Sequence, residues 1–390
     1  MSKTLQDYAI LINDTIQSNE INHYITTDNM CQNLGGIDTL KNINIPQGKV
    51  RSFQKDDVLL SNIRLYFRKV YRAKQKGGCS SDVLVFRAKH IDSATLFAIL
   101  SSQIFTDYAC SGSQGSKMPR GNKTHMMDFK IPTINFTIAK IFNSIQNKIE
   151  NNHKINELLH KILELLYEQY FVRFDFLDGN NKPYQTSGGK MKFSKELNRL
   201  IPNDFEVKTL GELITWISGS QPPKSCHIYE HKEGYIRFIQ NRDYSSNDYI
   251  TYIPISKNNK ICYQYDIMMD KYGEAGSVRF GLQGAYNVAL SKISVLNQSM
   301  QEYIRSYLNS KPIKKYLSNA CMASTRASLN ENHIYSLMLP IPPINLLQKY
   351  EKIAKNIITA IINNNQSTQT LTALRDFLLP LLLKQQVKPK

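Results

Sequence analysis

The amino-acid sequence contains one internal repeat, and this repeat constrains the fold more than any other feature. The motif DVLL at 57–60 returns as DIMM at 266–269, and IPTINF at 131–136 returns as IPPINL at 341–346. After its second motif, each copy continues into a long segment with helical periodicity. We therefore predict two globular units of the same fold, each followed by a long helix.

Both predicted helices carry apolar residues at alternating intervals of three and four, which is typical of a coiled-coil seam. In the first helix the seam positions are Ile138, Ile141, Ile145, Lys148, Asn152, Ile155, Leu159, Ile162 and Leu166. In the second they are Tyr350, Ile353, Ile357, Ala360, Asn364, Ser367, Leu371, Leu374 and Leu378. We expect the two helices to pair antiparallel within one chain. Residues 136–171 would span about 54 Å if fully helical, long enough to hold two domains apart.

Asn152 and Asn364 occupy the same seam position in the two helices. A buried polar residue in a seam costs stability but fixes the register and the partner. The alternative is a frayed patch in the middle of each helix, because the surrounding Asn-rich stretches are weak helix formers. The sequence leaves both interpretations open.

The stretch at 175–204 is rich in Gly, Asn, Lys and Ser, which indicates an exposed connector. The predicted fold class is α/β (α+β), with two units in pseudo-repeat separated by a long antiparallel two-helix coiled coil. The predicted organisation is a first unit at 1–135, a helix at 136–174, a linker at 175–208, a second unit at 209–343, a helix at 344–384 and a tail at 385–390.

The chain is strongly basic, with 49 Lys and Arg against 32 Asp and Glu and a formal net charge of +17. Such a charge attracts nucleic acid or an anionic membrane. The alternative is the general Lys, Asn and Ile bias of an AT-rich genome. No apolar run is long enough to span a membrane, and the N-terminus does not resemble a signal peptide. The six cysteines are scattered without a CxxC pair, so we expect reduced thiols and a cytoplasmic location.

The sequence lacks the motifs that an enzyme of this length is expected to show. It contains no GxGxxG or Walker A loop. The stretch DFEVK at 204–208 resembles half of a metal-dependent nuclease motif, but a second carboxylate on a neighbouring strand is missing. Cys226, His227 and His231 are too few for a structural zinc site, which needs four ligands. We therefore predict a non-catalytic chain with no metal site and no cofactor of its own.

Taken in order, several stretches resemble the DNA-specificity subunit of type I restriction-modification systems, and the resemblance runs from Thr4 to about Leu383. The stretches 56–70 and 77–88 resemble the hairpin region of a target-recognition domain in that family. SKMPRGNKTHMMDFKIP and ASTRASLNENHIYSLMLPIPP resemble the loop and short helix that lead into the family's two conserved helices. The stretches 165–191 and 201–213 resemble the bridge between the halves, and LTALRDFLLPLLL resembles the C-terminal helix end.

This resemblance implies that each globular unit is a target-recognition domain that reads one half of a split DNA sequence. It implies that the paired helices set the gap between the half-sites and dock two modification subunits, which bind S-adenosylmethionine and methylate adenine. Motor-nuclease (restriction) subunits that use ATP and Mg²⁺ can join. The specificity subunit itself is non-catalytic and serves prokaryotic defence. The alternative from another class is a protein-interaction scaffold that uses the paired helices and whose basic charge is incidental.

The basic stretch SNIRLYFRKVYRAKQKGG at 61–78 supplies most DNA-binding candidates in the first unit. Arg64, Arg68 and Arg72 are spaced by four, so they share a face on either a strand or a helix. Gly77-Gly78 suits a hairpin turn, and residues 83–86 suit a buried return strand. The candidates in this unit are Arg64, Tyr66, Arg68, Lys69, Arg72, Lys74, Lys117, Arg120, Asn122 and Lys123.

The second unit has more glycines and fewer charges in the equivalent region, DKYGEAGSVRFGLQGAYN at 270–287. Its DNA-binding candidates are Lys271, Tyr272, Arg279, Gln283, Tyr286, Asn287, Thr325 and Arg326. For any one of these residues the alternative is an ordinary solvated side chain. Because the two halves differ, we expect an asymmetric DNA target.

Overall fold

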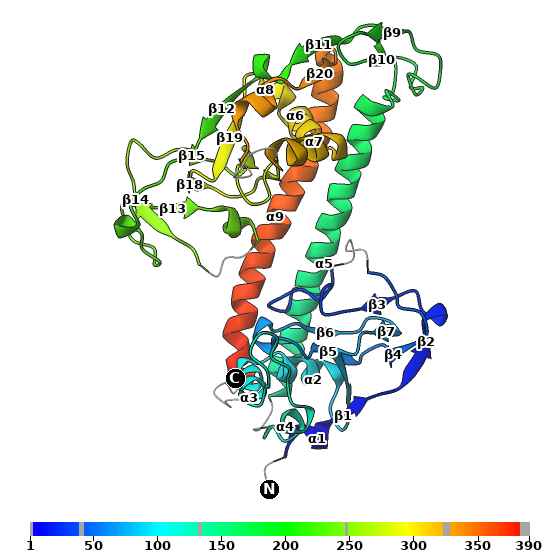
Figure 1. Ribbon diagram of the computed structural model, residues 1–390, viewed down its shortest axis with the longest axis vertical. Helices are drawn as coiled ribbons and strands as arrows, with labels where there is room; N and C mark the ends of the chain where they lie inside the picture. The colour runs from blue at the N-terminus through cyan, green and yellow to red at the C-terminus, as the bar shows by residue number, and fades with distance from the viewer. Residues whose placement is uncertain (1–2, 39–42, 132–134, 246–248, 323–327, 383–390) are drawn as a thin grey trace. The chain divides into compact units, whose positions relative to one another are not determined.

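The computed structural model describes residues 3–38, 43–131, 135–245, 249–322 and 328–382 (Figure 1). The chain divides into two units: unit 1 comprises residues 1–154 and 366–390, and unit 2 comprises residues 155–365. Both units combine antiparallel-rich sheets with helices, so the predicted α/β class is confirmed. The long helices α5 (Phe136–Tyr167) and α9 (Ile344–Leu382) each supply segments to both units.

The described part of unit 1 holds two four-stranded sheets. The first has the order β1-β8-β5-β6, from β1 (Ala9–Ile12), β5 (Val58–Ser61), β6 (Val70–Arg72) and β8 (Val83–Ala88). The second has the order β2-β4-β7-β3, from β2 (Thr15–Gln17), β3 (Tyr24–Ile25), β4 (Lys49–Phe53) and β7 (Gly77–Cys79). Short helices complete the unit: α1 (Leu5–Tyr8), α2 (Ser93–Leu100), α3 (Gln103–Ser111) and α4 (Lys123–Met127).

Strands β5 and β8 are buried on both faces, which explains their continuous apolar sequences. Leu84 and Phe86 pack on one face in a cluster that includes Phe97 of α2. Val83 and Val85 point to the opposite face, into a cluster formed with the second sheet. The predicted buried strand at 83–86 is therefore confirmed, and the first sheet lies between a helical layer and a second sheet.

Unit 2 repeats this arrangement. Its first sheet has the order β12-β19-β16-β17, from β12 (Ile214–Ser218), β16 (Ile267–Asp270), β17 (Val278–Arg279) and β19 (Leu290–Val295). Its second has the order β14-β13-β18-β15, from β13 (Tyr235–Ile239), β14 (Tyr252–Pro254), β15 (Ile261–Cys262) and β18 (Gly284–Tyr286). Unit 2 also contains an antiparallel pair of strands, β11 (Glu206–Thr209) and β20 (Met338–Ile341). Its short helices are α6 (Gln301–Asn309), α7 (Lys311–Met322) and α8 (Glu331–Tyr335).

Matching local contacts show that the sequence repeat is a repeat of structure. Thr4 and Asp7 form a capping box in unit 1, and Thr209 and Glu212 form one in unit 2. Asn122 caps α4 by accepting a hydrogen bond from a histidine backbone N–H three residues later, and Asn330 caps α8 in the same way. Both second sheets share a parallel pair, β3 with β7 and β13 with β18.

An ion pair also recurs between the central strands of the two first sheets. In unit 1, Arg87 of β8 donates to both carboxylate oxygens of the buried Asp57, at 2.7 and 2.8 Å. In unit 2, the Nζ atom of Lys292 on β19 lies 3.3 Å from Oδ2 of Asp266, the residue that matches Asp57. Each carboxylate also accepts a backbone N–H three residues earlier, so it closes the turn that leads into its strand.

Within each unit the segments of α5 and α9 pair antiparallel. In unit 1, Arg375 donates to Gln146 at 3.2 Å, and Asn152 donates to Thr368 at 3.1 Å. In unit 2, Asn156 donates to the Asn365 side chain at 2.8 Å. Residue numbers rise along one helix as they fall along the other, as the sequence predicted. Both helices are continuous through the Asn-rich stretches, and Asn152 is buried, which favours the seam interpretation over the frayed patch.

The predicted seam is correct at several positions and wrong by one residue at others. In α5, Ile138, Ile145 and Asn152 are buried as predicted, but Phe142 and Ile149 are buried in place of Ile141 and Lys148. In α9, Ala354 and Arg375 are buried in place of Ile353 and Leu374. Each helix carries two neighbouring apolar rows, and periodicity alone cannot tell which row faces the partner helix.

The stretch predicted as an exposed connector is mostly exposed, but parts of it are folded. It forms a hairpin of β9 (Met191–Ser194) and β10 (Arg199–Pro202). Phe176, Ile201 and Phe205 are buried in the core of unit 2. These apolar residues are far apart in a polar stretch, so composition alone concealed their burial.

We predict a pH-dependent stability that originates at Glu351 on α9. Its carboxylate accepts the backbone N–H of Glu302 at the start of α6, at 2.9 Å. Burial raises the pKa of Glu351 from 4.5 to about 7, against the lowering effect of that hydrogen bond. The folded state therefore binds the proton more tightly than the unfolded state does. This stabilising contribution is full below pH 4.5 and is lost as the pH rises through 7.

Urea unfolding of wild type and Glu351→Gln at pH 5 and pH 8 measures this effect. We expect the variant to lose less stability than wild type between the two pH values, because glutamine keeps the acceptor and does not ionise. Glu331→Gln, at an exposed position on α8, is the control and should behave like wild type. An identical pH dependence in Glu351→Gln and wild type would contradict the assignment.

Candidate nucleic-acid interface

The basic stretch 61–78 does not form the hairpin that the sequence predicted. Strand β5 ends at Ser61, a 3-10 turn covers Leu65–Phe67, and β6 begins at Val70. Arg64 and Arg68 flank the turn, and each has a left-handed backbone with φ of 50°. Because these two residues reverse the chain direction, the prediction that Arg64, Arg68 and Arg72 share one face is wrong.

Four of the cationic side chains in this stretch are held by the fold of unit 1. Arg68 is mostly buried and donates to the Ser101 carbonyl at 3.0 Å, and burial lowers its pKa. Arg72 is also mostly buried and lies 3.7 Å from Asp56. The two lysines reach other elements: Lys69 donates to the Thr27 carbonyl at 2.5 Å, and Lys74 donates to Asn147 of α5 at 2.7 Å.

The glycines at 77 and 78 lie in strand β7, not in the predicted turn. A Cβ atom on Gly77 would lie 2.5 Å from the His23 carbonyl oxygen. One on Gly78 would lie 2.5 Å from the side chain of Ile21. The glycines are therefore required for close packing between strands.

A short loop in unit 1 carries two exposed candidates, Lys117 and Arg120. Gln114 and Arg120 exchange two backbone hydrogen bonds, of 2.9 and 2.8 Å, that close the loop. The Arg64 N–H donates to the Pro119 carbonyl at 2.9 Å, and the Gly121 N–H donates to the Asn62 carbonyl at 3.1 Å. These bonds fasten the loop to the segment that follows β5.

The loop and its support form a basic surface with apolar tips. We name as the loop surface the residues Arg64, Tyr66, Lys117, Met118, Arg120 and Lys123. Met118 is 59% exposed and Tyr66 is 53% exposed. Arg64 donates to the Lys117 carbonyl at 3.3 Å, which links the two parts. The sequence named five of these six residues but missed Met118, whose signal was an apolar residue between Lys117 and Arg120. Asn122, also named, caps α4.

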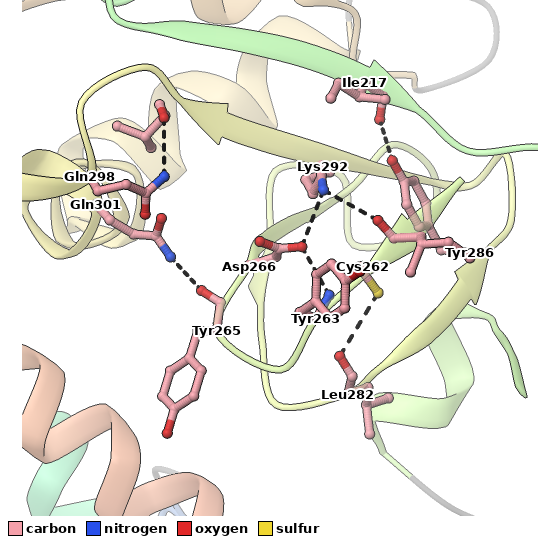
Figure 2. Close-up of polar contacts among 12 residues, drawn as sticks. Ile217, Cys262, Tyr263, Tyr265, Asp266, Leu282, Tyr286, Lys292, Gln298 and Gln301 are labelled. Atoms are coloured by element: carbon pink, nitrogen blue, oxygen red, sulfur yellow. Dashed lines mark hydrogen bonds and ion pairs between the residues drawn. The ribbon is translucent and has the colours of Figure 1, made fainter. Parts of the chain in front are cut away.

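In unit 2, two of the predicted residues belong to the interior. Tyr286 is fully buried, and its hydroxyl donates to the Ile217 carbonyl at 3.1 Å (Figure 2). Arg279 donates to the buried Asp270 at 2.9 Å and to Glu274 at 2.5 Å. Tyr286 thus links the two sheets of unit 2, and Arg279 holds β17 against β16 within the first sheet. Lys292 of β19 also links the two sheets, because its ammonium donates to the Ile261 carbonyl of β15 (Figure 2).

The other described candidates of unit 2 lie nearer the surface. Tyr272 is 44% exposed, and the Lys271 ammonium lies 5.9 Å from its ring centroid. Gln283 is exposed and Asn287 is partly buried. Thr325 and Arg326 lie outside the described residues.

Across the described ranges, no three or more His, Cys, Asp or Glu side chains gather where they could hold a metal ion. Over the same ranges, no helix is both long enough and apolar enough to cross a membrane.

We predict that Arg68 supports the fold of unit 1. Arg68→Ala removes a donor from the Ser101 carbonyl and a cation that lies 4.0 Å from Asp376. Hydrogen bonds to charged groups contribute about 1.5–3 kcal/mol, so we expect a loss of stability of that order in urea unfolding. Lys76→Ala, at an exposed position in the same stretch, should leave the unfolding midpoint unchanged. Equal midpoints for both variants would refute a structural role for Arg68.

Comparison with known proteins agrees with these observations. Residues 202–373 match the family model of the type I restriction modification DNA specificity domain. The type I restriction enzyme MjaIX specificity subunit of Methanocaldococcus jannaschii is 25% identical over 300 residues, which cover 74% of this chain and 67% of that protein. The HindI specificity subunit of Haemophilus influenzae is 23% identical over 314 residues, which cover 64% of this chain and 66% of that protein.

A solved structure shows the same fold. The S subunit of the type I restriction-modification system from M. genitalium matches with a TM-score of 0.63 and 14% identity, over 98% of this chain and 96% of that one. The family model, the similar sequences and the shared fold agree with the repeated units and paired helices described above. Residues 202–373 thus match the type I restriction modification DNA specificity domain, a family that recognises DNA sequence and is in general non-catalytic. Over 74% of its length the chain is similar to a type I restriction enzyme specificity subunit.

Proposed function

We propose that this chain reads a split, asymmetric DNA target, one half with each unit, and directs adenine methylation and restriction by partner subunits. The observation that carries the proposal is one fold repeated with unlike surfaces. Unit 1 presents the loop surface, in which Arg120 and Lys117 are exposed. In unit 2 the equivalent stretch, 270–287, exposes Tyr272 and Gln283 and contains fewer Lys and Arg residues than 61–78. Two domains of one fold with different exposed side chains suit two different half-sites.

Exposed apolar rows on the helices support the docking of protein partners. In unit 2, Ile155, Leu158, Ile162 and Leu165 of α5 follow heptad spacing, and all four are more than 40% exposed. In unit 1, Phe377 of α9 is 68% exposed. A second heptad row beside the buried seam is typical of a helix that packs against further helices.

The proposed partners are two modification subunits, which would carry S-adenosylmethionine, and motor-nuclease subunits, which would carry ATP and Mg²⁺. In this proposal the chain itself binds no cofactor, performs no catalysis and works in the cytoplasm. The net charge of +17 supports contact with duplex DNA.

The same apolar rows also favour the alternative of a protein scaffold with incidental charge. A salt titration separates the two functions, because each neutralised phosphate contributes a slope of about −0.9 to a plot of log K against log salt. A steep slope on duplex DNA supports the proposed function, and a flat one supports the scaffold.

Methylome sequencing tests the proposal in a host that carries this chain and active modification subunits. We expect methyladenine at a motif with two short, unlike blocks separated by an unconstrained gap. A host with active modification subunits but without such a motif would refute the proposal.

Charge placed in the exposed row of α5 tests partner docking. We expect Leu158→Glu combined with Leu165→Glu to reduce copurification of the modification subunits at least tenfold, because docking would then bury charge without a partner. Asn309→Glu, at an exposed position of α6 and so outside the row, should leave copurification unchanged. Full copurification of the double variant would exclude docking through this row.

A further inference from the structure

Arg120 differs from every other arginine of unit 1 in its exposure. Its side chain is 60% exposed, whereas Arg68 and Arg72 are 14% and 15% exposed. The remaining arginines of this unit are partly or fully buried: Arg51, Arg64, Arg87 and Arg375. Arg120 is thus the arginine of unit 1 whose guanidinium is most free to reach another molecule.

The backbone of Arg120 is fixed although its side chain is exposed. Its N–H donates to the Gln114 carbonyl at 2.8 Å, and its carbonyl accepts the Gln114 N–H at 2.9 Å. It also forms a bridge with Ile63, so it is paired on both sides. The neighbouring Gly121 donates to the Asn62 carbonyl at 3.1 Å. A side chain on such a backbone loses little further backbone entropy on binding.

A carboxylate holds one edge of the Arg120 side chain. One terminal nitrogen donates to Oδ1 of Asp82 at 2.9 Å. Asp82 lies just before β8, and its backbone carbonyl accepts the Asn62 N–H at 2.8 Å, so it belongs to the same support as the loop. An ion pair this exposed contributes little to stability, and its main effect is on orientation. A guanidinium has five N–H donors, so one such contact leaves donors available for a second acceptor pair.

We propose that Arg120 reads guanine in the major groove for unit 1, and that Asp82 is the positioning residue that orients it. This inference rests on the proposed function of DNA reading. Guanine presents two acceptors, N7 and O6, that match the planar fork of arginine. Asp82 orients that fork before the DNA arrives, which lowers the entropy cost of the contact.

Two lysines of the loop surface, Lys117 and Lys123, differ from Arg120 in the kind of contact they suit. Lys117 is exposed in the loop, and Lys123 is exposed in the first turn of α4. The described contacts hold neither ammonium against a carboxylate. A lysine ammonium is a mobile point charge suited to phosphate, which carries no sequence information. Lys123 is therefore a matched control for charge without base reading.

The test is selection of bound duplexes from a randomised DNA library by the full chain, followed by sequencing. Wild type should enrich a motif that contains a guanine in one block. Arg120→Lys keeps the charge but loses the fork, so the preference for guanine at that one position should fall about tenfold or more while the rest of the motif remains. Asp82→Ala should relax the same position, and Asp82→Glu should restore part of the preference.

The control variant and the results that would contradict the proposal give different readouts. Lys123→Ala should weaken binding to all sequences alike and leave the motif unchanged. If Arg120→Lys and Arg120→Ala also leave the motif unchanged, Arg120 does not read a base, although the proposed function stands. If wild type enriches no motif at all, the proposed function fails together with this inference. If Arg120→Lys loses the preference for guanine at this position but Asp82→Ala keeps it, Asp82 does not orient Arg120.

Discussion

Apolar packing of α5 and α9 into the cores is the constraint on which both units depend. In unit 1, Phe142 of α5 and Leu379 of α9 join the cluster that holds Phe97. In unit 2, Phe171 lies in the π-helical segment Glu168–Val172 that continues α5, and its ring centroid lies 4.5 Å from Tyr303 and 4.8 Å from Tyr350 of α9. Neither globular fold closes its core without residues from both helices. The helices are therefore structural parts of each unit as well as a connection between repeats, which explains why each copy of the repeat includes one.

Buried polar contacts add specificity to this apolar packing. The Gln146 amide donates to the Leu34 carbonyl at 2.7 Å and accepts from Arg375, so one side chain ties a loop of unit 1 to both helices. In unit 2, Asn364 donates to Asn156 at 2.9 Å. A slip of either helix by one residue would separate these groups and leave them buried without partners, at about 1–3 kcal/mol for each. The apolar rows supply the affinity between the helices, and the polar pairs fix their register.

The repeated features of the fold were predictable from the sequence, whereas the features that depend on three-dimensional contacts were not. The α/β class, the repeat and the antiparallel pairing followed from matched motifs and periodicity. The choice between two neighbouring apolar rows, such as Ile141 against Phe142, did not follow, because it depends on which elements cover the helix. The shared face of the arginines failed because the left-handed backbone at Arg64 and Arg68 has no signature in a regular spacing. Likewise, the pairing of Arg120 with Asp82 joins residues that the sequence places far apart.

In the proposed function, each unit contacts its own stretch of one DNA target. Photo-crosslinking from two positions on the full chain, bound to a duplex that carries its motif, tests this most directly. A photoreactive amino acid would replace either Met118 in unit 1 or Tyr272 in unit 2, both of which are exposed. We expect crosslinks from position 118 in one block of the motif and from position 272 in the other, with none shared. Crosslinks from both positions to the same nucleotides would contradict this expectation.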